Sequence, residues 1–99
     1  MLSSKFSYKG TSMKEIVQVV ENMSKDIDKL VKHYRVIDPH KERQMELLAN
    51  IIDWNKGYLN IVSLDTISRM VESIANGEQT SDNIRLVLGK IGLKVNWSN

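Results

Sequence analysis

Two histidines, His33 and His40, are the only imidazole side chains in the sequence and the first candidates for metal binding or acid–base chemistry. Pro39 lies between them. Its ring disfavours a helical backbone at the preceding residue and supplies no N–H to the helix ladder, so the two histidines do not share one helix. The chain also lacks cysteine. Since a zinc site needs several ligands held at fixed spacing, we expect no metal site.

Four acids occur as two closely spaced pairs, Asp26 with Asp28 and Glu42 with Glu46. Paired carboxylates can act as general acid and base, but acids at such spacings on a charged helix face are usually solvated. No serine stands in a glycine-flanked nucleophile elbow, and no glycines have the spacing of a phosphate-binding loop. We therefore expect a protein that is not an enzyme, with no catalytic residues, no metal and no other cofactor.

The composition is typical of one globular domain. The chain has 99 residues, of which 41% are apolar and 26% are charged, and its net charge is +2. This balance predicts a folded chain without the dense positive charge of an obligate nucleic-acid binder. There is no cysteine, no apolar run long enough to span a bilayer and no apolar export segment in residues 1–10, so we expect the protein in the cytoplasm.

The longest periodic pattern follows an expected flexible arm at residues 1–11. Ser12 and Glu15 match a capping box. Apolar residues then recur at alternating steps of three and four, which predicts one amphipathic helix up to the break at Pro39. They are Met13, Ile16, Val20, Met23, Ile27, Leu30, Tyr34 and Ile37. This seam is either the inward face of the longest helix in a monomeric bundle or, in part, a contact between two copies of the chain.

Three shorter amphipathic segments follow the first helix. The second helix is expected to begin at Asp38 and Pro39, which suit the cap and the first helical position, and to end at Gly57 in a left-handed conformation. The third helix is expected to take Ser63 as its cap and to end at Gly77.

A fourth, short helix is expected between the capping groups of residues 80–83 and Gly92. Leu93, Val95 and Trp97 then alternate with polar residues, so this tail can lie extended across the bundle with one face inward. Short links favour antiparallel neighbours. The sequence thus predicts an all-α fold, an antiparallel four-helix bundle that forms a single domain over residues 12–99.

Basic residues gather in two places. Around the first helix junction they are Lys29, Lys32, Arg35, Lys41 and Arg43. Interleaved acids favour a solvated face there, and the alternative is a contact with an anionic surface. Near the C-terminus, Arg85, Lys90, Lys94 and Trp97 form the candidate partner-binding site. A positive end with a tryptophan suits anionic lipid headgroups, phosphate or a protein groove, although Trp97 can instead serve as a lid on the core.

Two segments resemble helix-turn-helix proteins of the phage-repressor type, namely residues 66–69 (Thr-Ile-Ser-Arg) and residues 83–95. This resemblance implies a recognition helix that enters the major groove and presents side chains to base edges. Under this alternative, the protein is a small transcriptional regulator and its partner is DNA.

A second resemblance covers more of the chain. A long first helix is followed by Glu46-Leu-Leu in the second helix, by residues 67–74 (Ile-Ser-Arg-Met-Val-Glu-Ser-Ile), by residues 84–92 (Ile-Arg-Leu-Val-Leu-Gly-Lys-Ile-Gly) and by a short tail. This order resembles the immunity proteins of pediocin-like (enterocin A type) bacteriocins. The resemblance implies a small cytoplasmic bundle that confers antimicrobial resistance.

In that family, the immunity protein is thought to engage the bacteriocin-occupied sugar-transporter receptor from the cytoplasmic face of the membrane, and the C-terminal half governs specificity. For this chain the resemblance implies a protein partner, with peripheral membrane contact, at the tail that contains Lys90, Lys94 and Trp97. A third alternative is a dimeric helical interaction module in which two copies pair through the first helix.

Overall fold

The computed structural model describes residues 13–96, with Met13 described by its backbone alone. Its α-helices are α2 (Met13–Ile37), α3 (Pro39–Trp54), α4 (Ile61–Ala75) and α5 (Ser81–Lys90). A single 3₁₀ turn, η1 (Lys56–Tyr58), lies between α3 and α4. Residues 13–96 contain no strand. The expected arm at residues 1–11, the Ser12 cap and the Trp97 side chain lie outside the described residues.

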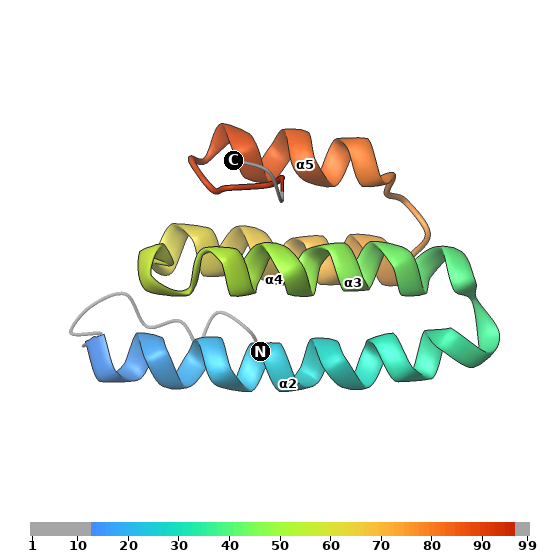
Figure 1. The fold of residues 1–99 in the computed structure, drawn as a ribbon, viewed down its shortest axis with the longest axis horizontal. Helices are drawn as coiled ribbons and strands as arrows, with labels where there is room; N and C mark the ends of the chain where they lie inside the picture. The colour runs from blue at the N-terminus through green and yellow to red at the C-terminus, as the bar shows by residue number, and fades with distance from the viewer. Residues whose placement is uncertain (1–12, 97–99) are drawn as a thin grey trace.

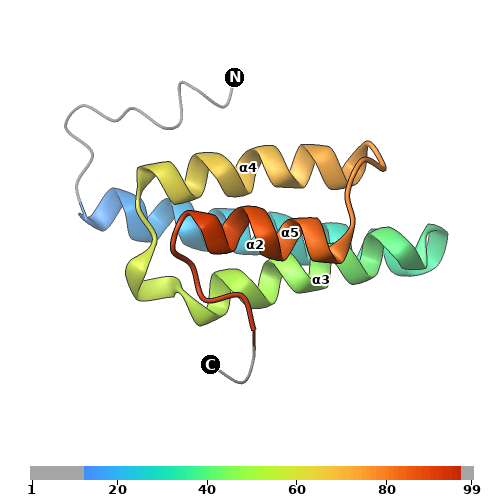
Figure 2. The same ribbon diagram turned by 90° about the horizontal axis from the view of Figure 1, so that it is seen from above.

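Consecutive helices run antiparallel, and together they measure 39 × 31 × 19 Å (Figure 1). α3 and α4 lie side by side in the middle of the molecule, α2 covers one side of this pair and α5 covers the other (Figure 1). From above, α5 lies along the line between α3 and α4 (Figure 2). The prediction of an all-α helical bundle is therefore confirmed. Among residues 13–96, no helix combines the length and apolarity needed to cross a membrane.

The core lies between the layers, and every helix contributes to it. The most deeply buried side chains are Ile27, Met45, Leu48, Ile51, Ile52, Leu64, Ile67, Ile74, Ile84 and Leu88. Four of the ten belong to α3, because α3 contacts α2, α4 and α5 at once. Close-packed aliphatic side chains from all four helices provide the main stabilisation of such a domain.

The predicted seam of α2 packs within this single chain. Val20, Ile27 and Tyr34 are buried against the bundle, as is Val31 beside them. The seam stops short of the helix end, since Ile37 is 61% exposed. The monomeric alternative therefore accounts for the centre of the seam.

The junction between α2 and α3 forms as the sequence predicts. Asp38 is the cap of α3, and its Oδ1 accepts from the backbone N–H groups of His40 and Lys41 at 3.1 and 3.2 Å. Pro39 occupies the first turn, where its missing N–H leaves no hydrogen bond unmade. The Asp38–Pro39 pair thus both ends α2 and starts α3.

The segment between α3 and α4 differs from the prediction at two positions. Ser63 is not the cap of α4, because Asn60 takes that place: Asn60 Oδ1 accepts from the Ser63 N–H at 2.9 Å and from the Ser63 hydroxyl at 3.1 Å. α4 therefore begins three residues earlier than a Ser63 cap predicts, at Ile61 instead of Leu64. Gly57 is not a left-handed terminator, since it lies inside η1 and the cap of α3 is Asn55.

The last two helices end near Gly77 and Gly92, as the sequence predicts, and both glycines adopt the left-handed conformation expected at Gly57. Gly77 has φ +75° and Gly92 has φ +95°. Beyond α4, the Glu78 N–H bonds to the Ser73 carbonyl at 3.0 Å, and beyond α5 the Leu93 N–H bonds to the Leu88 carbonyl at 3.1 Å. These are the long hydrogen bonds of Schellman motifs.

The tail after α5 alternates as the sequence predicts. Leu93 is buried, Lys94 is exposed and Val95 is partly buried against the core. The tail therefore lies across the bundle with one face inward.

Candidate partner-binding site

Asn55 fastens the C-terminal tail to the end of α3. Its Nδ2 donates to the Lys94 carbonyl at 2.7 Å, and its Oδ1 accepts from the Lys94 N–H at 2.9 Å. The second amide hydrogen has its own partner, the Ile51 carbonyl at 2.7 Å. Asn55 is 4% exposed, and a buried amide is tolerated when its polar groups are bonded in this way. The backbone of Lys94 is thus fixed relative to α3.

The tail also packs against α5. A methyl group at Gly89 would lie 3.8 Å from Val95 Cγ2, so the tail passes beside this exposed glycine of α5. Leu93 inserts into the core next to this contact. The tail therefore contacts two elements, the end of α3 through Asn55 and α5 through Val95.

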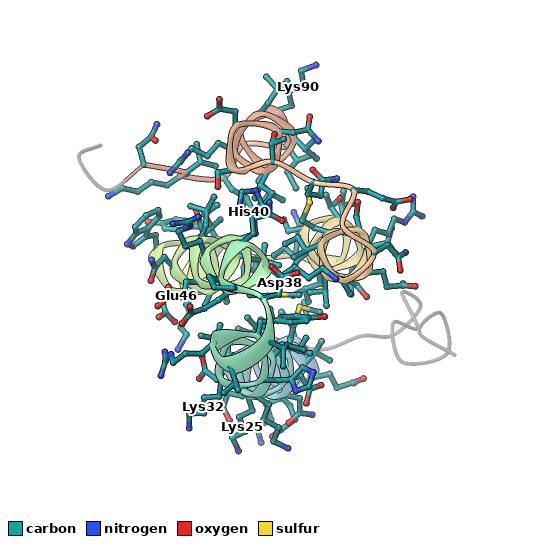
Figure 3. All side chains as sticks on the ribbon, turned by 90° about the vertical axis from the view of Figure 1, so that its right-hand side faces the viewer. Lys25, Lys32, Asp38, His40, Glu46 and Lys90 are labelled. Carbon is teal, nitrogen blue, oxygen red and sulfur yellow. The ribbon has the colours of Figure 1, made fainter. Side chains whose placement is uncertain are left out.

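α5 does not bring Arg85 and Lys90 onto one face. Five helical residues turn by about 500°, so the two side chains point about 140° apart. Arg85 lies one turn before Gly89, on the side of the tail, and its Nη1 lies 3.8 Å from Asp82 Oδ1. Lys90 lies one turn after Leu86 instead. Figure 3 shows Lys90 projecting from the outer side of α5.

Two exposed aliphatic side chains accompany the lysines at this end of the molecule. Leu86 is 56% exposed and Ile91 is 36% exposed. Within residues 13–96, no ion pair engages the ammonium group of Lys90 or Lys94. We call these four exposed residues, Leu86 and Lys90 one turn apart on α5 with Ile91 and Lys94 just beyond its end, the α5–tail face. Its lysines offer positive charge to an anionic partner, and its aliphatic side chains offer apolar contact area.

The basic residues at the first helix junction differ in their interactions, since Arg35 has an ion pair and Lys29 and Lys32 have none among the described residues. Arg35 Nε lies 2.7 Å from Glu42 Oε2, and the hydrogen bond and charge of this carboxylate raise the pKa of Arg35, to which Glu46 adds. Arg35 therefore remains positive, and its charge is paired with a carboxylate of α3. Lys29 and Lys32 are exposed on α2, and within residues 13–96 neither has an ion pair.

Lys41 makes its contacts within the bundle. Its Nζ donates to the Ala75 carbonyl at 2.8 Å, lies 5.5 Å from the centre of the Tyr34 ring and is 3.9 Å from Asp38 Oδ2. A cation at this position neutralises the negative end of α4 and satisfies a carbonyl that the helix leaves unbonded. Lys41 is thus a structural residue.

The residues first considered for chemistry do not assemble into a reactive centre. Asp26 and Asp28 are both exposed on α2, and Glu42 is held by Arg35. His33 packs against the neighbouring Tyr34 ring at 5.3 Å between centroids. In the described part of the chain, no three histidine, aspartate or glutamate side chains converge as metal ligands do.

A shallow groove of about 340 Å³ lies between α4 and α5. Its lining residues are Thr66, Arg69, Met70, Ser73, Gln79 and Val87. The polar groups along it are already bonded: Gln79 Nε2 donates to Ser73 Oγ at 2.8 Å, and the Arg69 guanidinium lies 3.0 Å from Asp65. This groove therefore offers no nucleophile with an adjacent base.

Comparison of the chain with models of protein families, with curated proteins and with solved structures gave no significant match. The resemblance to bacteriocin immunity proteins and the resemblance to helix-turn-helix regulators therefore stay predictions from the sequence.

Two contributors to the site were not among the predicted residues. Asn55 bonds to Lys94 across 39 positions of the sequence, and no local spacing reports a contact of that range. Leu86 had a local signal, because it falls outside the helical spacing of Ile84 and Leu88 and so points away from the core. The spacing therefore predicts the exposure of Leu86, although a single exposed apolar residue does not by itself mark a contact.

Proposed function

We propose that this chain is a non-enzymatic binding protein of the bacteriocin-immunity type, which protects a cell by engaging a bacteriocin–receptor complex at the cytoplasmic face of the membrane. The order of the helical segments, with the motifs in residues 67–74 and 84–92, motivates this proposal. The antiparallel bundle with an ordered tail is compatible with it (Figure 1).

The observation that carries the proposal is the fixed position of the tail. Asn55 holds the Lys94 backbone, and Lys90 belongs to α5, so both lysines are presented from ordered parts of the structure. A surface that is ordered before binding loses less conformational entropy when a partner docks. The exposed Leu86 and Ile91 supply the apolar part of the contact.

The experiment is expression in a strain that is sensitive to pediocin-like bacteriocins, with resistance measured as the inhibitory concentration of each bacteriocin in a panel. The proposal predicts protection against at least one of them. Lys90→Glu with Lys94→Glu is expected to abolish the protection without unfolding the protein, because both side chains are exposed. Unchanged sensitivity of cells that contain the wild-type protein, across the panel, would contradict the proposal.

A matched control is the reversal of one other exposed charge. Arg43 lies on α3, is exposed and has no ion pair within residues 13–96. Arg43→Glu is expected to retain the protection, whereas the single change Lys90→Glu, which gives the same net charge, is expected to weaken it. Equal loss in both variants would place the contact elsewhere on the surface.

The alternative function, DNA-binding regulation, is less favoured by the arrangement of the helices. A helix-turn-helix joins its two helices at about 90–120° through a turn of three or four residues. Here α4 and α5 run antiparallel through residues 76–80 (Figure 2). The regulator alternative predicts retention on random duplex DNA at low salt that falls steeply as salt rises, which the same purified protein can test.

The dimer alternative is less favoured, because several of the seam residues that would pair two copies are buried within one chain. Val20, Ile27 and Tyr34 are buried within the chain, and Val17, beside the seam, is 51% exposed. Sedimentation tests it directly, since a pairing of two copies predicts a mass that rises with concentration.

A further inference from the structure

The outermost line of α2 is positively charged and free of acids. Taking 100° per residue, seven residues lie within about 40° of the line opposite the buried Ile27. They are Lys14, Gln18, Asn22, Lys25, Lys29, Lys32 and Val36, and all seven are exposed. We call this set the α2 crest. Its central lysines, Lys25, Lys29 and Lys32, span about 10 Å along the helix.

The acids of α2 stand on its flanks. Glu15 and Asp26 lie on one side of the crest, and Glu21 and Asp28 lie on the other, each about 60–80° from the outermost line. The near balance of charge along α2 therefore conceals a separation of charge around it. Composition alone gives no sign of this separation.

The four crest lysines are not used by the fold. Within residues 13–96, no ion pair or hydrogen bond engages the ammonium groups of Lys14, Lys25, Lys29 or Lys32. Figure 3 shows Lys25 and Lys32 pointing away from the bundle, on the side opposite Lys90.

We propose that the α2 crest docks on the surface of a bilayer that contains anionic lipid. A plane that approaches the crest meets the lysines first, and the flanking acids stay farther from it. At the C-terminal end of the crest, Val36 is 84% exposed and supplies an apolar side chain that can enter the interface. Charge complementarity and the shape of a single protruding helix both fit this partner.

A nucleic-acid groove fits less well. When a helix enters a groove, the phosphates of both walls face its flanks. On α2 those flanks carry Glu15 and Asp26 on one side and Glu21 and Asp28 on the other, and these acids would repel the phosphates. The position of the acids thus distinguishes a flat anionic partner from a grooved one.

The expected attraction is modest. A lysine close to an anionic bilayer strengthens partitioning by about fivefold, so the crest alone gives weak, reversible and salt-sensitive binding. Such a contact orients the protein more than it anchors it. With the crest on the bilayer, α5 lies at the opposite end of the 31 Å dimension (Figure 1), and Lys90 points away from the lipid (Figure 3). The inference rests on α2 and is independent of the proposed function.

The test is co-sedimentation of the full chain, at low ionic strength, with vesicles of phosphatidylglycerol and phosphatidylcholine and with vesicles of phosphatidylcholine alone. We expect binding only to the anionic vesicles and its loss when salt is added. Lys25→Gln with Lys32→Gln should lower the partition coefficient by about 25-fold, since two lysines contribute about fivefold each. The control, Lys90→Gln with Lys94→Gln, removes the same charge from the α5–tail face and should lower it less than twofold.

Each other result would overturn the inference. Equal weakening by the two double variants would mean that only net charge matters. Absence of binding to anionic vesicles at low ionic strength would mean that the crest is simply solvated. Tighter binding to random duplex DNA than to anionic vesicles, lost in the variant of Lys25 and Lys32, would assign the crest to nucleic acid. Unchanged thermal unfolding of both double variants serves as the check on folding.

Discussion

Asn55 and Lys94 are joined by a pair of hydrogen bonds in which one side-chain amide replaces a strand partner. The amide donates to the Lys94 carbonyl at 2.7 Å and accepts from the Lys94 N–H at 2.9 Å. A two-bonded contact of this kind fixes the direction of the tail as well as its distance from α3. It also links the stability of the bundle to the position of the candidate partner-binding lysines.

The isosteric change Asn55→Asp should destabilise the protein by about 3 kcal/mol, because two donated hydrogen bonds are lost and a buried carboxylate faces two carbonyl oxygens. The deficit should shrink as the pH falls, since a protonated carboxyl group regains one donor. The measurement is urea unfolding at several pH values. Asn50→Asp, at an exposed position of α3, is the control and should stay within about 0.5 kcal/mol of the wild type. A small, pH-independent effect of Asn55→Asp would show that the tail is not held by this amide.

Ile27→Asp should unfold the protein. Ile27 is 1% exposed at the centre of the α2 seam, and an unpaired carboxylate there costs several kcal/mol, while a domain of this size has a total of about 5–15 kcal/mol. Val36→Asp makes the same change on the same helix at a side chain that is 84% exposed, and it should retain the helical circular dichroism and cooperative melting of the wild type. A folded Ile27→Asp protein would mean that α2 packs with a different face.

Lys41→Met should lower the free energy of unfolding by about 1–2 kcal/mol. The methionine keeps most of the apolar stem but removes the bond to the Ala75 carbonyl and the positive charge near the Tyr34 ring. Lys29→Met, on the exposed crest of α2, is the comparison and should change the stability by no more than about 0.5 kcal/mol. Equal effects of the two changes would show that Lys41 does not cap α4.

The fold could be predicted where local chemistry leaves one solution. Pro39 cannot continue α2 and suits the first turn of α3, so the junction follows from two adjacent residues. The start of α4 had two solutions, because Asn60 and Ser63 are both capping residues. The structure takes Asn60, whose carbonyl oxygen serves both the backbone N–H and the hydroxyl of Ser63. Propensity at single positions does not resolve such a competition.

The candidate site could be predicted only in part. The sequence shows the positive charge near the C-terminus. It also shows that Arg85 and Lys90 lie on different sides of the helix, because they are five helical positions apart. The anchoring of Lys94 by Asn55 was not visible, since it depends on how the end of α3 meets a segment 39 residues away. Contacts that decide the position of a surface are tertiary, and they follow from the packing of whole helices.

Two glycines of the chain should respond to alanine with opposite signs. Gly77 has φ +75°, and its added methyl group would meet nothing closer than Lys41 Cε at 4.0 Å, so the cost of Gly77→Ala is conformational, about 1–2 kcal/mol. Gly57 has no positive φ and open space around it, so Gly57→Ala should stabilise the protein by about 0.4–1 kcal/mol through the unfolded state. Thermal or urea unfolding of the two variants measures both effects. If Gly57→Ala lost as much stability as Gly77→Ala, the result would indicate that Gly57 has the left-handed conformation that the sequence predicts.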